Sequence, residues 1–357
     1  MVLIEQVSKF ILNFAGRLGV MMKRVLSAII ACTLLICTRS VSGVAAAFGT
    51  EEGNEWSNLI DNFDPFLEYQ VEDVSAISED FVEPKMSAEL EMAIEEADPL
   101  SEVSYNMKTG EISLKPYETL EKNDMVETTP SHVVSEDDYS SPYLASDNRT
   151  RIYSVTTYPY CAVVQVKAYF NNGKVTLSGT GAMVGEKTVL TAGHVVYDQE
   201  YGWASKVEIV PGGTLSGYNT YSSSNITSVK KWTEEGNFEY DYAVVELDES
   251  PGVGHFGTRA ETTSNLRADS FYTYGFPGDK TSGSLWRTGG SAYLIRTTQF
   301  AFHAYPTNGF SGGPVVAQDD TSYIVGILSG DSYVDGEYYG LAVRVTSDVV
   351  DFVKRHI

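Results

Sequence analysis

Short β-rich runs separated by turn residues fill residues 142–357, and this pattern constrains the fold more than any other feature of the chain. Gly, Ser, Thr, Tyr and Val dominate this region. Regular short strands with Gly-rich turns and few helices favour a closed all-β architecture. The clearest predicted strands lie at 161–170, 187–192, 242–247, 271–274 and 323–328.

The C-terminal end is the exception to the β pattern. Its apolar residues follow helical spacing after a Thr-Ser cap, at Val349, Val350, Phe352, Val353 and Ile357. We therefore expect the all-β domain to end in one helix.

Negative charge is concentrated in one segment. The chain has 48 acidic and 25 basic residues, a formal net charge of −23. Residues 48–143 hold 25 of the acids and 4 of the bases, whereas residues 144–357 hold 22 and 16. A nucleic-acid binder needs a cationic face for phosphate, so this balance argues against that class of protein.

Residues 21–47 have the layout of a secretory signal peptide. Lys23 and Arg24 form a cationic start, residues 25–37 are apolar, and three alanines at 45–47 offer a cleavage site. The apolar run of about 13 residues is shorter than the roughly 20 that a membrane span needs. The segment predicts export, with no stable membrane association after the signal is removed.

The region before Met21 is out of place for a signal peptide, which normally begins at its charged end. A start codon assigned too early, making residues 1–20 foreign to the protein, is our preferred explanation. An uncleaved anchor is the alternative. Lipid attachment at Cys37 is disfavoured because the bulky Ile36 precedes it.

Residues 48–141 form an acidic segment of low hydrophobicity and little β-alternation. One helical pattern stands out at residues 86–97, with Ser87 as its cap. The segment could be a disordered spacer or a pro-segment that orders only against its own protein. We favour a pro-segment, so the predicted domains are a signal region at 1–47, a pro-segment at 48–141 and a folded domain at 142–357.

Cysteine usage leaves the exported domain without a disulfide. Cys32 and Cys37 lie in the signal region, and Cys161 is alone in the rest of the chain. Its neighbours Tyr160, Ala162 and Val163 favour a buried, inert thiol over a catalytic one. The stability of the domain must therefore come from its core.

Three short stretches carry chemistry. His194 follows a predicted strand in a Gly-His turn, Asp241 leads an apolar strand, and Ser311 lies in a Gly-rich turn before another strand. A serine hydroxyl becomes nucleophilic when a neutral imidazole accepts its proton, and a buried carboxylate holds that imidazole in the right tautomer. Each motif alone is weak, but the three in order, 47 and 70 residues apart, predict a catalytic triad.

With these residues in view, the chain resembles the secreted bacterial glutamyl endopeptidases (V8-like), a branch of the chymotrypsin-like serine proteases. Beyond the triad stretches, the resemblance rests on residues 147–151, 157–160 and the Gly-Phe-Pro-Gly-Asp-Lys run at 275–280. It covers residues 145–357 and implies two six-stranded β-barrels with the site in the cleft between them. His194 and Asp241 would come from the first barrel and Ser311 from the second.

The resemblance also implies the residues that bind substrate. The oxyanion donors would be the backbone N–H groups of Gly309 and Ser311. The specificity pocket and the edge that pairs with the substrate backbone would involve Tyr305, Pro306, Asn308, Leu328, Ser329 and Gly330.

Three departures from the family pattern matter. Bacillus-type relatives often have a cysteine pair around the catalytic histidine, where this chain has Gly179 and Val195. Phe310 replaces the Asp that in chymotrypsin receives the new N-terminus. Leu328 and Pro306 stand where Glu-specific members have a His and a Thr, so strict Glu specificity is expected to be weakened or lost.

Other polar residues are given structural roles. His303 could face the specificity pocket, but a structural or surface role is preferred. His255 and His356 have no metal-ligand spacing, so no metal and no cofactor is predicted. Asp331 and the pair at 319–320 are expected to be solvated loop acids, and the tyrosines at 333, 338 and 339 either rim the cleft or cover the barrel.

The predicted function is a secreted serine endopeptidase, a monomer made as a pro-enzyme that acts on protein or peptide substrates and binds its own pro-segment. Maturation is expected near Pro142, where the acidic charge ends; cleavage after Arg149 or Arg151, ahead of Ile152, is the alternative. A trypsin-fold binding protein that has lost catalysis is the rival class, and an esterase-like hydrolase is a weaker third.

Overall fold

The computed structural model describes most of the chain beyond the predicted signal region. The chain divides into two units, residues 1–55 and residues 56–357. Of the first, only the start of helix α3 (Glu51–Asp61) is described, and the second unit is treated below. The predicted signal peptide and the maturation site near Pro142 lie outside the described residues, which are 51–65, 70–71, 81–118, 127–133 and 147–357.

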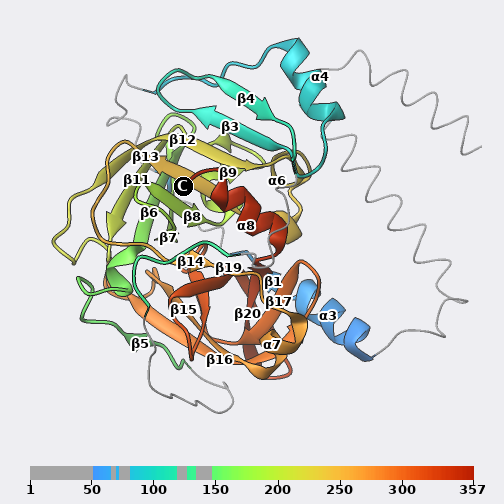
Figure 1. The fold of residues 1–357 in the computed structure, drawn as a ribbon, viewed down its shortest axis with the longest axis vertical. Coiled ribbons are helices and arrows are strands. Elements are labelled where there is room, and N and C mark those ends of the chain that lie inside the picture. The colour runs from blue at the N-terminus through green and yellow to red at the C-terminus, as the bar shows by residue number, and fades with distance from the viewer. Residues whose placement is uncertain (1–50, 66–69, 72–80, 119–126, 134–146) are drawn as a thin grey trace, which may run out of the picture. The chain divides into compact units, whose positions relative to one another are not determined.

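Six antiparallel strands close the first barrel (Figure 1). The order is β11-β6-β7-β8-β13-β12, and β11 pairs with β12 to complete the ring. Burial alternates along β6, as expected for a strand with one face in the core. The strands are β6 (Val163–Phe170), β7 (Val175–Met183), β8 (Thr188–Thr191), β11 (Lys206–Pro211), β12 (Tyr221–Val229) and β13 (Ala243–Leu247).

The second barrel has the same construction. Its order is β19-β18-β15-β16-β17-β20, closed by pairing of β19 with β20. Phe271, Phe300 and Phe302 are fully buried in its core. The strands are β15 (Ser270–Gly275), β16 (Trp286–Ile295), β17 (Gln299–His303), β18 (Pro314–Ala317), β19 (Tyr323–Val334) and β20 (Glu337–Arg344). Two six-stranded barrels were predicted, and the structure confirms them.

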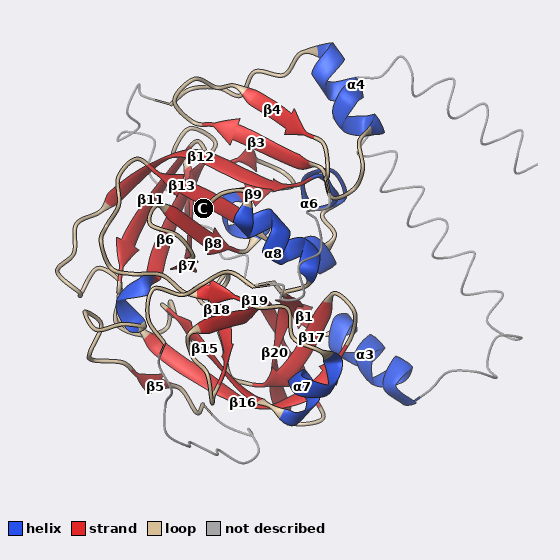
Figure 2. Ribbon diagram, viewed as in Figure 1, coloured by secondary structure: helices blue, strands red, loops and turns tan. Residues whose placement is uncertain are grey.

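Helices are short and lie at the ends and connections of strands (Figure 2). The predicted C-terminal helix is α8 (Ser347–Lys354), which begins after Thr346 without a hydrogen bond from that side chain. Its apolar face packs on the first barrel, where the rings of Phe352 and Tyr242 lie 5.1 Å apart. Within the described residues, no helix has both the length and the apolar character needed to cross a membrane.

Smaller elements complete the fold. They are β5 (Thr150–Arg151), η2 (Tyr160–Ala162), α5 (Gly193–Val196), β9 (Tyr197–Asp198), β10 (Gly202–Trp203), α6 (Lys230–Glu235), η3 (Phe238–Tyr240), β14 (Gly257–Thr258) and α7 (Thr263–Ala268).

The acidic segment contributes more strand than its sequence indicates. It contains β1 (Phe63–Asp64), β2 (Gln70–Val71), α4 (Ala88–Glu96), β3 (Glu102–Asn106) and β4 (Ile112–Lys115). Ser87 caps α4 as predicted, accepting a hydrogen bond from the N–H of Leu90 at 3.1 Å. β3 pairs antiparallel with β12 and so extends the first barrel's sheet. β3 also pairs with the nearby β4, but β12, which joins this hairpin to the barrel, lies more than 100 residues away in sequence.

A buried ionic network fastens β3 to the C-terminus. Glu102, 2% exposed, contacts the guanidinium of Arg355 and the imidazole of His356, and His356 also lies 3.0 Å from Glu246. Burial opposes the charged imidazole, but the hydrogen bonds to Glu102 and Glu246 raise the pKa of His356. No role was predicted for His356, because neither carboxylate is near it along the chain.

Thr180, on β7, joins the two barrels beside the Ser311 turn. Its N–H donates to the carbonyl of Ser311 at 2.7 Å, and its hydroxyl donates to the carbonyl of Gly309 at 2.6 Å. The same hydroxyl accepts from the N–H of Phe276 at 3.2 Å. Thr180 is fully buried, so none of these groups has water as a substitute partner.

We predict that Thr180→Val destabilises the protein by about 1–3 kcal/mol, because it keeps the side-chain shape but leaves a buried carbonyl and a buried N–H unpaired. For a domain of this size the melting temperature should fall by several degrees, measured by thermal unfolding. Thr176→Val is the matched control, since Thr176 is buried on the same strand and its hydroxyl has no hydrogen bond to another described residue. Equal melting temperatures for the two variants would contradict the bridging role.

Candidate active site

His194 and Asp241 form a tightly held pair in the first barrel. His194 lies in α5, directly after β8, and Asp241 lies between η3 and β13. The N–H of His194 donates to Asp241 Oδ1 at 2.8 Å, and Nδ1 lies 2.7 Å from Oδ2. The bond to Nδ1 places the imidazole proton there and leaves Nε2 as the basic nitrogen.

Asp241 is the most buried charged group at the site, with no exposed surface. Besides His194, it accepts a 2.5 Å hydrogen bond from the hydroxyl of Ser329 on β19 of the second barrel. A buried carboxylate is costly unless its oxygens are hydrogen-bonded, and these donors meet that need from both barrels. Ser329, predicted to contact substrate, thus has a structural bond to the Asp–His pair.

Glycine is required before His194 because an aromatic side chain covers the position. A Cβ at Gly193 would lie 2.7 Å from Cδ1 of Trp232, which no side chain could occupy. The ring of Trp232 lies 6.4 Å from that of His194 and 5.3 Å from that of Phe238. These aromatics form a wall on one side of the imidazole.

Ser311 lies in a tight turn between β17 and β18. The N–H of Phe310 donates to Thr307 and that of Gly313 donates to Phe310. Gly309 and Gly312 have φ values of +97° and +79°, and a Cβ on Gly312 would lie 2.2 Å from the hydroxyl of Thr191. Both positions therefore need glycine.

The backbone of this turn leaves two N–H donors next to Ser311 without a partner in the turn. The carbonyl of Asn308 accepts from Gly278 at 2.9 Å, and the carbonyl of Gly309 is held by Thr180. Within the described residues, the turn's hydrogen bonds use the N–H groups of Phe310, Gly312 and Gly313, not those of Gly309 and Ser311. This is the arrangement that an oxyanion hole requires.

The hydroxyl of Ser311 and Nε2 of His194 are both buried. Each residue is 2% exposed, and neither of these two atoms has a hydrogen-bond partner among the described residues. Both atoms are therefore closed to solvent, and no hydrogen bond joins Ser311 to His194.

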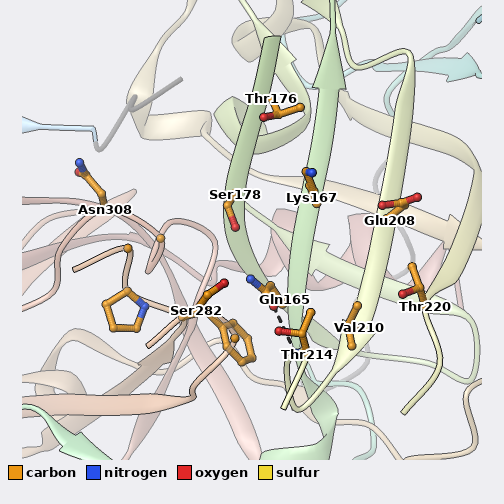
Figure 3. Close-up of a pocket in the computed structure, with 15 residues that line it drawn as sticks. Gln165, Lys167, Thr176, Ser178, Glu208, Val210, Thr214, Thr220, Ser282 and Asn308 are labelled. Carbon is orange, nitrogen blue, oxygen red and sulfur yellow. Dashed lines mark hydrogen bonds between the residues drawn. The ribbon is translucent and has the colours of Figure 1, made fainter. Parts of the chain in front are cut away.

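An open cavity of about 490 Å³ reaches the turn from the first barrel (Figure 3). Gln165 and Lys167 of β6, Ser178 of β7 and Glu208 of β11 line one side. Asn308, Gly309 and the Phe276–Gly278 loop line the other. Figure 3 shows the labelled polar side chains from the first barrel facing Asn308 and Ser282 across this cavity.

The predicted pocket residues fall into two groups. Leu328 and Pro306 are buried, and Leu328 packs in the second barrel's core beside Phe302 and Phe310. Tyr305 is half-buried and packs on Tyr338, with ring centroids 4.3 Å apart. A Cβ on Gly330 would lie 2.2 Å from the carbonyl oxygen of Asp64, so the acidic segment passes directly over this part of β19.

Sequence reasoning overlooked Arg149, whose side chain is 2% exposed. Its guanidinium donates to Asp147, to Asp279 and, at 2.7 Å, to the hydroxyl of Thr307, and it lies over the Tyr305 ring. Hydrogen bonds from Arg149 hold the pKa of both carboxyls below the usual range. The sequence signal was the Asp-Asn-Arg stretch itself, but its partner Asp279 is 130 residues away.

The positions that replace the family's cysteine pair are adjacent. A Cβ on Gly179 would lie 2.9 Å from Cγ2 of Val195, so the side chain of Val195 fills this space. Phe310 is fully buried in the second barrel's core. Cys161 is buried as predicted; its thiol donates to the carbonyl of Val253 at 3.1 Å, and burial raises its pKa.

The remaining candidates take structural positions. The His303 ring packs against Tyr293 and Tyr339, and its Nδ1 lies 3.2 Å from Glu337; burial lowers its pKa. The prediction that Asp331 is a solvated loop acid was wrong, because it lies within β19 opposite Asp64. Among the described residues no group of His, Cys, Asp or Glu side chains could hold a metal ion.

Comparison with known proteins agrees with this geometry. The family model described as Trypsin matches residues 150–353. A glutamyl endopeptidase of Bacillus licheniformis is 35% identical over 218 residues, covering 58% of this chain and 66% of that protein. A protein of Bacillus subtilis described as an extracellular metalloprotease is 37% identical over 222 residues, covering 60% of this chain and 69% of that protein.

More distant relatives share the fold. Glutamyl endopeptidases of Staphylococcus aureus are 26% identical over 231 residues, covering 62% of this chain and 65% of the relative from strain MW2. A solved Glu endopeptidase structure aligns with a TM-score of 0.51 at 23% identity, covering 59% of this chain and 97% of that one. The matched length and the paired barrels lead to one conclusion: this chain belongs to the trypsin family, as a serine protease related to the bacterial glutamyl endopeptidases.

Proposed function

We propose that the protein is a secreted serine endopeptidase that uses His194, Asp241 and Ser311 and is made as an inactive precursor. The observation that carries the proposal is the buried Asp241–His194 pair, with Nδ1 of the imidazole 2.7 Å from the carboxylate, set against a serine in a glycine turn. This pairing supplies what a serine nucleophile lacks, a base of fixed tautomer.

The chemistry would proceed through an acyl-enzyme. Nε2 of His194 accepts the Ser311 proton as Oγ attacks the scissile carbonyl, and Asp241 stabilises the imidazolium that forms. The N–H groups of Gly309 and Ser311 donate to the developing oxyanion. The imidazolium then protonates the leaving amine, and a water molecule, activated by the same base, releases the acyl group.

A trypsin-fold binding protein without catalysis is the alternative. A binding protein has no need for a buried carboxylate that orients an imidazole. Burying that charge costs desolvation free energy and does not improve binding. Support for catalysis therefore comes from the intact Asp241–His194 pair and the two backbone donors together.

Maturation before Asp147 fits the structure better than cleavage after Arg149. The Arg149 side chain is buried between two carboxylates, and Ile152 is 9% exposed with its N–H bonded to Leu285. Cleavage sites are normally exposed and locally free. We propose that residues 48–141 are a pro-segment removed near Pro142, so that Asp147 to Ile152 stay with the mature domain.

The P1 preference would be neutral or apolar. A buried carboxylate needs donors or a cation, and the side chains of Leu328 and Pro306 supply neither. Arg149 lies near Tyr305 and Thr307, but its charge is already matched by Asp147 and Asp279. Glu recognition would therefore have to disrupt an existing ion network.

We predict that Ser311→Ala removes essentially all peptidase activity, because triad loss typically costs on the order of 10⁴–10⁶ in rate. The thermal unfolding of the variant should match that of the original protein. Labelling by a fluorophosphonate, located by mass spectrometry, should fall on Ser311 in the mature protein. The exposed Ser291 offers the control Ser291→Ala, which should stay fully active. Persistent hydrolysis by Ser311→Ala would rule out the mechanism.

We predict an N-terminus between residues 135 and 147 for the secreted active protein, because Arg149 and Ile152 are built into the second barrel. N-terminal sequencing measures it directly. An active form beginning at Thr150 or Ile152 would contradict the assignment, and one beginning upstream of about residue 100 would refute the pro-segment.

We predict that peptides differing only at P1 are cleaved faster with Leu, Phe or Ala than with Glu. Including Gln as an uncharged isostere of Glu separates the effect of charge from that of shape. The measurement is kcat/KM for each peptide with mature protein. A preference for Glu of more than about tenfold, or about 1.4 kcal/mol, would show that the pocket holds donors not accounted for here.

A further inference from the structure

The edge of β19 next to the catalytic groups is paired with a strand from the acidic segment. β1 lies antiparallel to β19, with Phe63 opposite Ser332 and Asp64 opposite Asp331. The pairing sits two to three residues beyond Ser329, whose hydroxyl is bonded to Asp241. At about 3.3 Å per residue, β1 therefore lies within about 10 Å of the triad's carboxylate along the strand.

The direction of β1 is the direction a substrate would take. β19 runs away from Asp241 as it passes from Ser329 to Ser332, so an antiparallel strand runs toward the catalytic groups from its N-terminus to its C-terminus. The acyl half of a substrate must approach Ser311 in this sense, because its scissile carbonyl is at its C-terminal end. The carbonyl oxygen of Asp64 also lies over Gly330, on the edge predicted to pair with substrate.

The side chain of Phe63 packs at the far end of a row of aromatic rings that leads to His194. Its ring lies 4.9 Å from Phe238 in an edge-on arrangement, and Phe238 packs on Trp232, which faces His194. A cavity of about 540 Å³ between α3 and η3 includes Phe63, Phe238 and Gln299 in its lining. A substrate side chain as far from the scissile bond as Phe63 is would contact the same ring of Phe238.

Helix α3 anchors the strand. Trp56 and Leu59 are 5% and 0% exposed and pack with Leu294 and Leu341 of the second barrel. The hydroxyl of Ser332 donates to the carbonyl of Leu59 at 3.0 Å. The tethered strand thus has a high effective concentration at the β19 edge, which a free peptide would have to overcome.

We propose that β1 is a pseudosubstrate strand: Phe63 and Asp64 fill the acyl-side backbone and side-chain sites along β19, and the precursor is inactive because substrate cannot pair there. This inference rests on the proposed function. It agrees with the burial of His194 and Ser311 in the full-length chain. The cavity at Asn308 and Gly309 has no residue of β1 or β19 in its lining, so the block is confined to the acyl side (Figure 3).

A carboxylate pair makes this block sensitive to pH. Asp331 faces Asp64 on β1 and lies near Tyr338 on β20, which packs on Tyr305; Gly340 is opposite Asp331 in register. Burial, together with the charge of Asp64, raises the pKa of Asp331 to about 7. Docking of β1 therefore takes up a proton, so the docked state loses stability as the pH rises from about 4 toward 7 and is weakest above that.

The test compares the uncut full-length chain with its own mature product. Hydrolysis of a tetrapeptide anilide, with the P1 residue chosen by profiling, is followed before any cleavage is visible on a gel. We expect the uncut chain to be at least 100-fold slower than mature protein, and Phe63→Ala and Asp64→Pro to raise the uncut rate at least tenfold. Asp64→Pro acts by removing the backbone N–H from the strand. Met92→Ala, an exposed change in α4, is the control and should have no effect.

Every variant yields the same mature sequence, which separates the two hypotheses. Inactive mature protein would refute the proposed function. Two results with active mature protein would overturn the pseudosubstrate strand alone. One is an uncut chain that hydrolyses the anilide as fast as mature protein does. The other is a set of uncut variants that are no faster than the uncut original chain. The ratio of uncut to mature rates should rise several-fold from pH 5 to pH 8, and this rise should be smaller in Asp64→Asn, which removes the charge of Asp64 but not the burial of Asp331. A flat ratio in the original chain would overturn the role of the carboxylate pair.

Discussion

The buried carboxylate of Asp241 is the constraint on which the site depends. It has no exposed surface and accepts hydrogen bonds from the backbone and ring of His194 and from Ser329. Because Ser329 belongs to the second barrel, the Asp241–His194 pair and the barrel interface are parts of one polar network. Thr180 makes the reciprocal link, from the first barrel to the turn that holds Ser311. These hydrogen bonds therefore fix the position of His194 relative to Ser311.

The acidic segment is attached to both barrels by different means. On the first barrel, β3 extends the sheet and Glu102 is buried against Arg355 and His356. On the second, α3 and β1 cover an apolar face and the β19 edge. Much of the segment's acidity stays on the exposed surface, as along α4. Two of its acids make contacts that depend on pH: the buried Glu102 binds Arg355 and His356, and the exposed Asp64 faces Asp331.

Specificity has a similar electrostatic logic. Arg149, Lys280, Asp147 and Asp279 form a compact cluster whose charges balance, beside the residues expected to form the P1 pocket. Both cations of this cluster are already matched by carboxylates and Leu328 lies in the core, which is why a neutral or apolar P1 residue is proposed. Gly179 and Val195, which stand at the positions of the family's cysteine pair, keep the surroundings of His194 apolar.

The sequence by itself determined the all-β class, the C-terminal helix, the helix at 88–96 with its Ser87 cap and the three stretches that hold His194, Asp241 and Ser311. These follow from local periodicity, capping and turn chemistry, which a short window of sequence contains. Only the tertiary structure decided the pairings of Glu102 with His356, Arg149 with Asp279, and Asp64 with Asp331. It also showed that Asp331, expected in a loop, lies in a strand. Such contacts join residues more than 100 positions apart, and their geometry is set only when the barrels close and the edges of β12 and β19 find their partners.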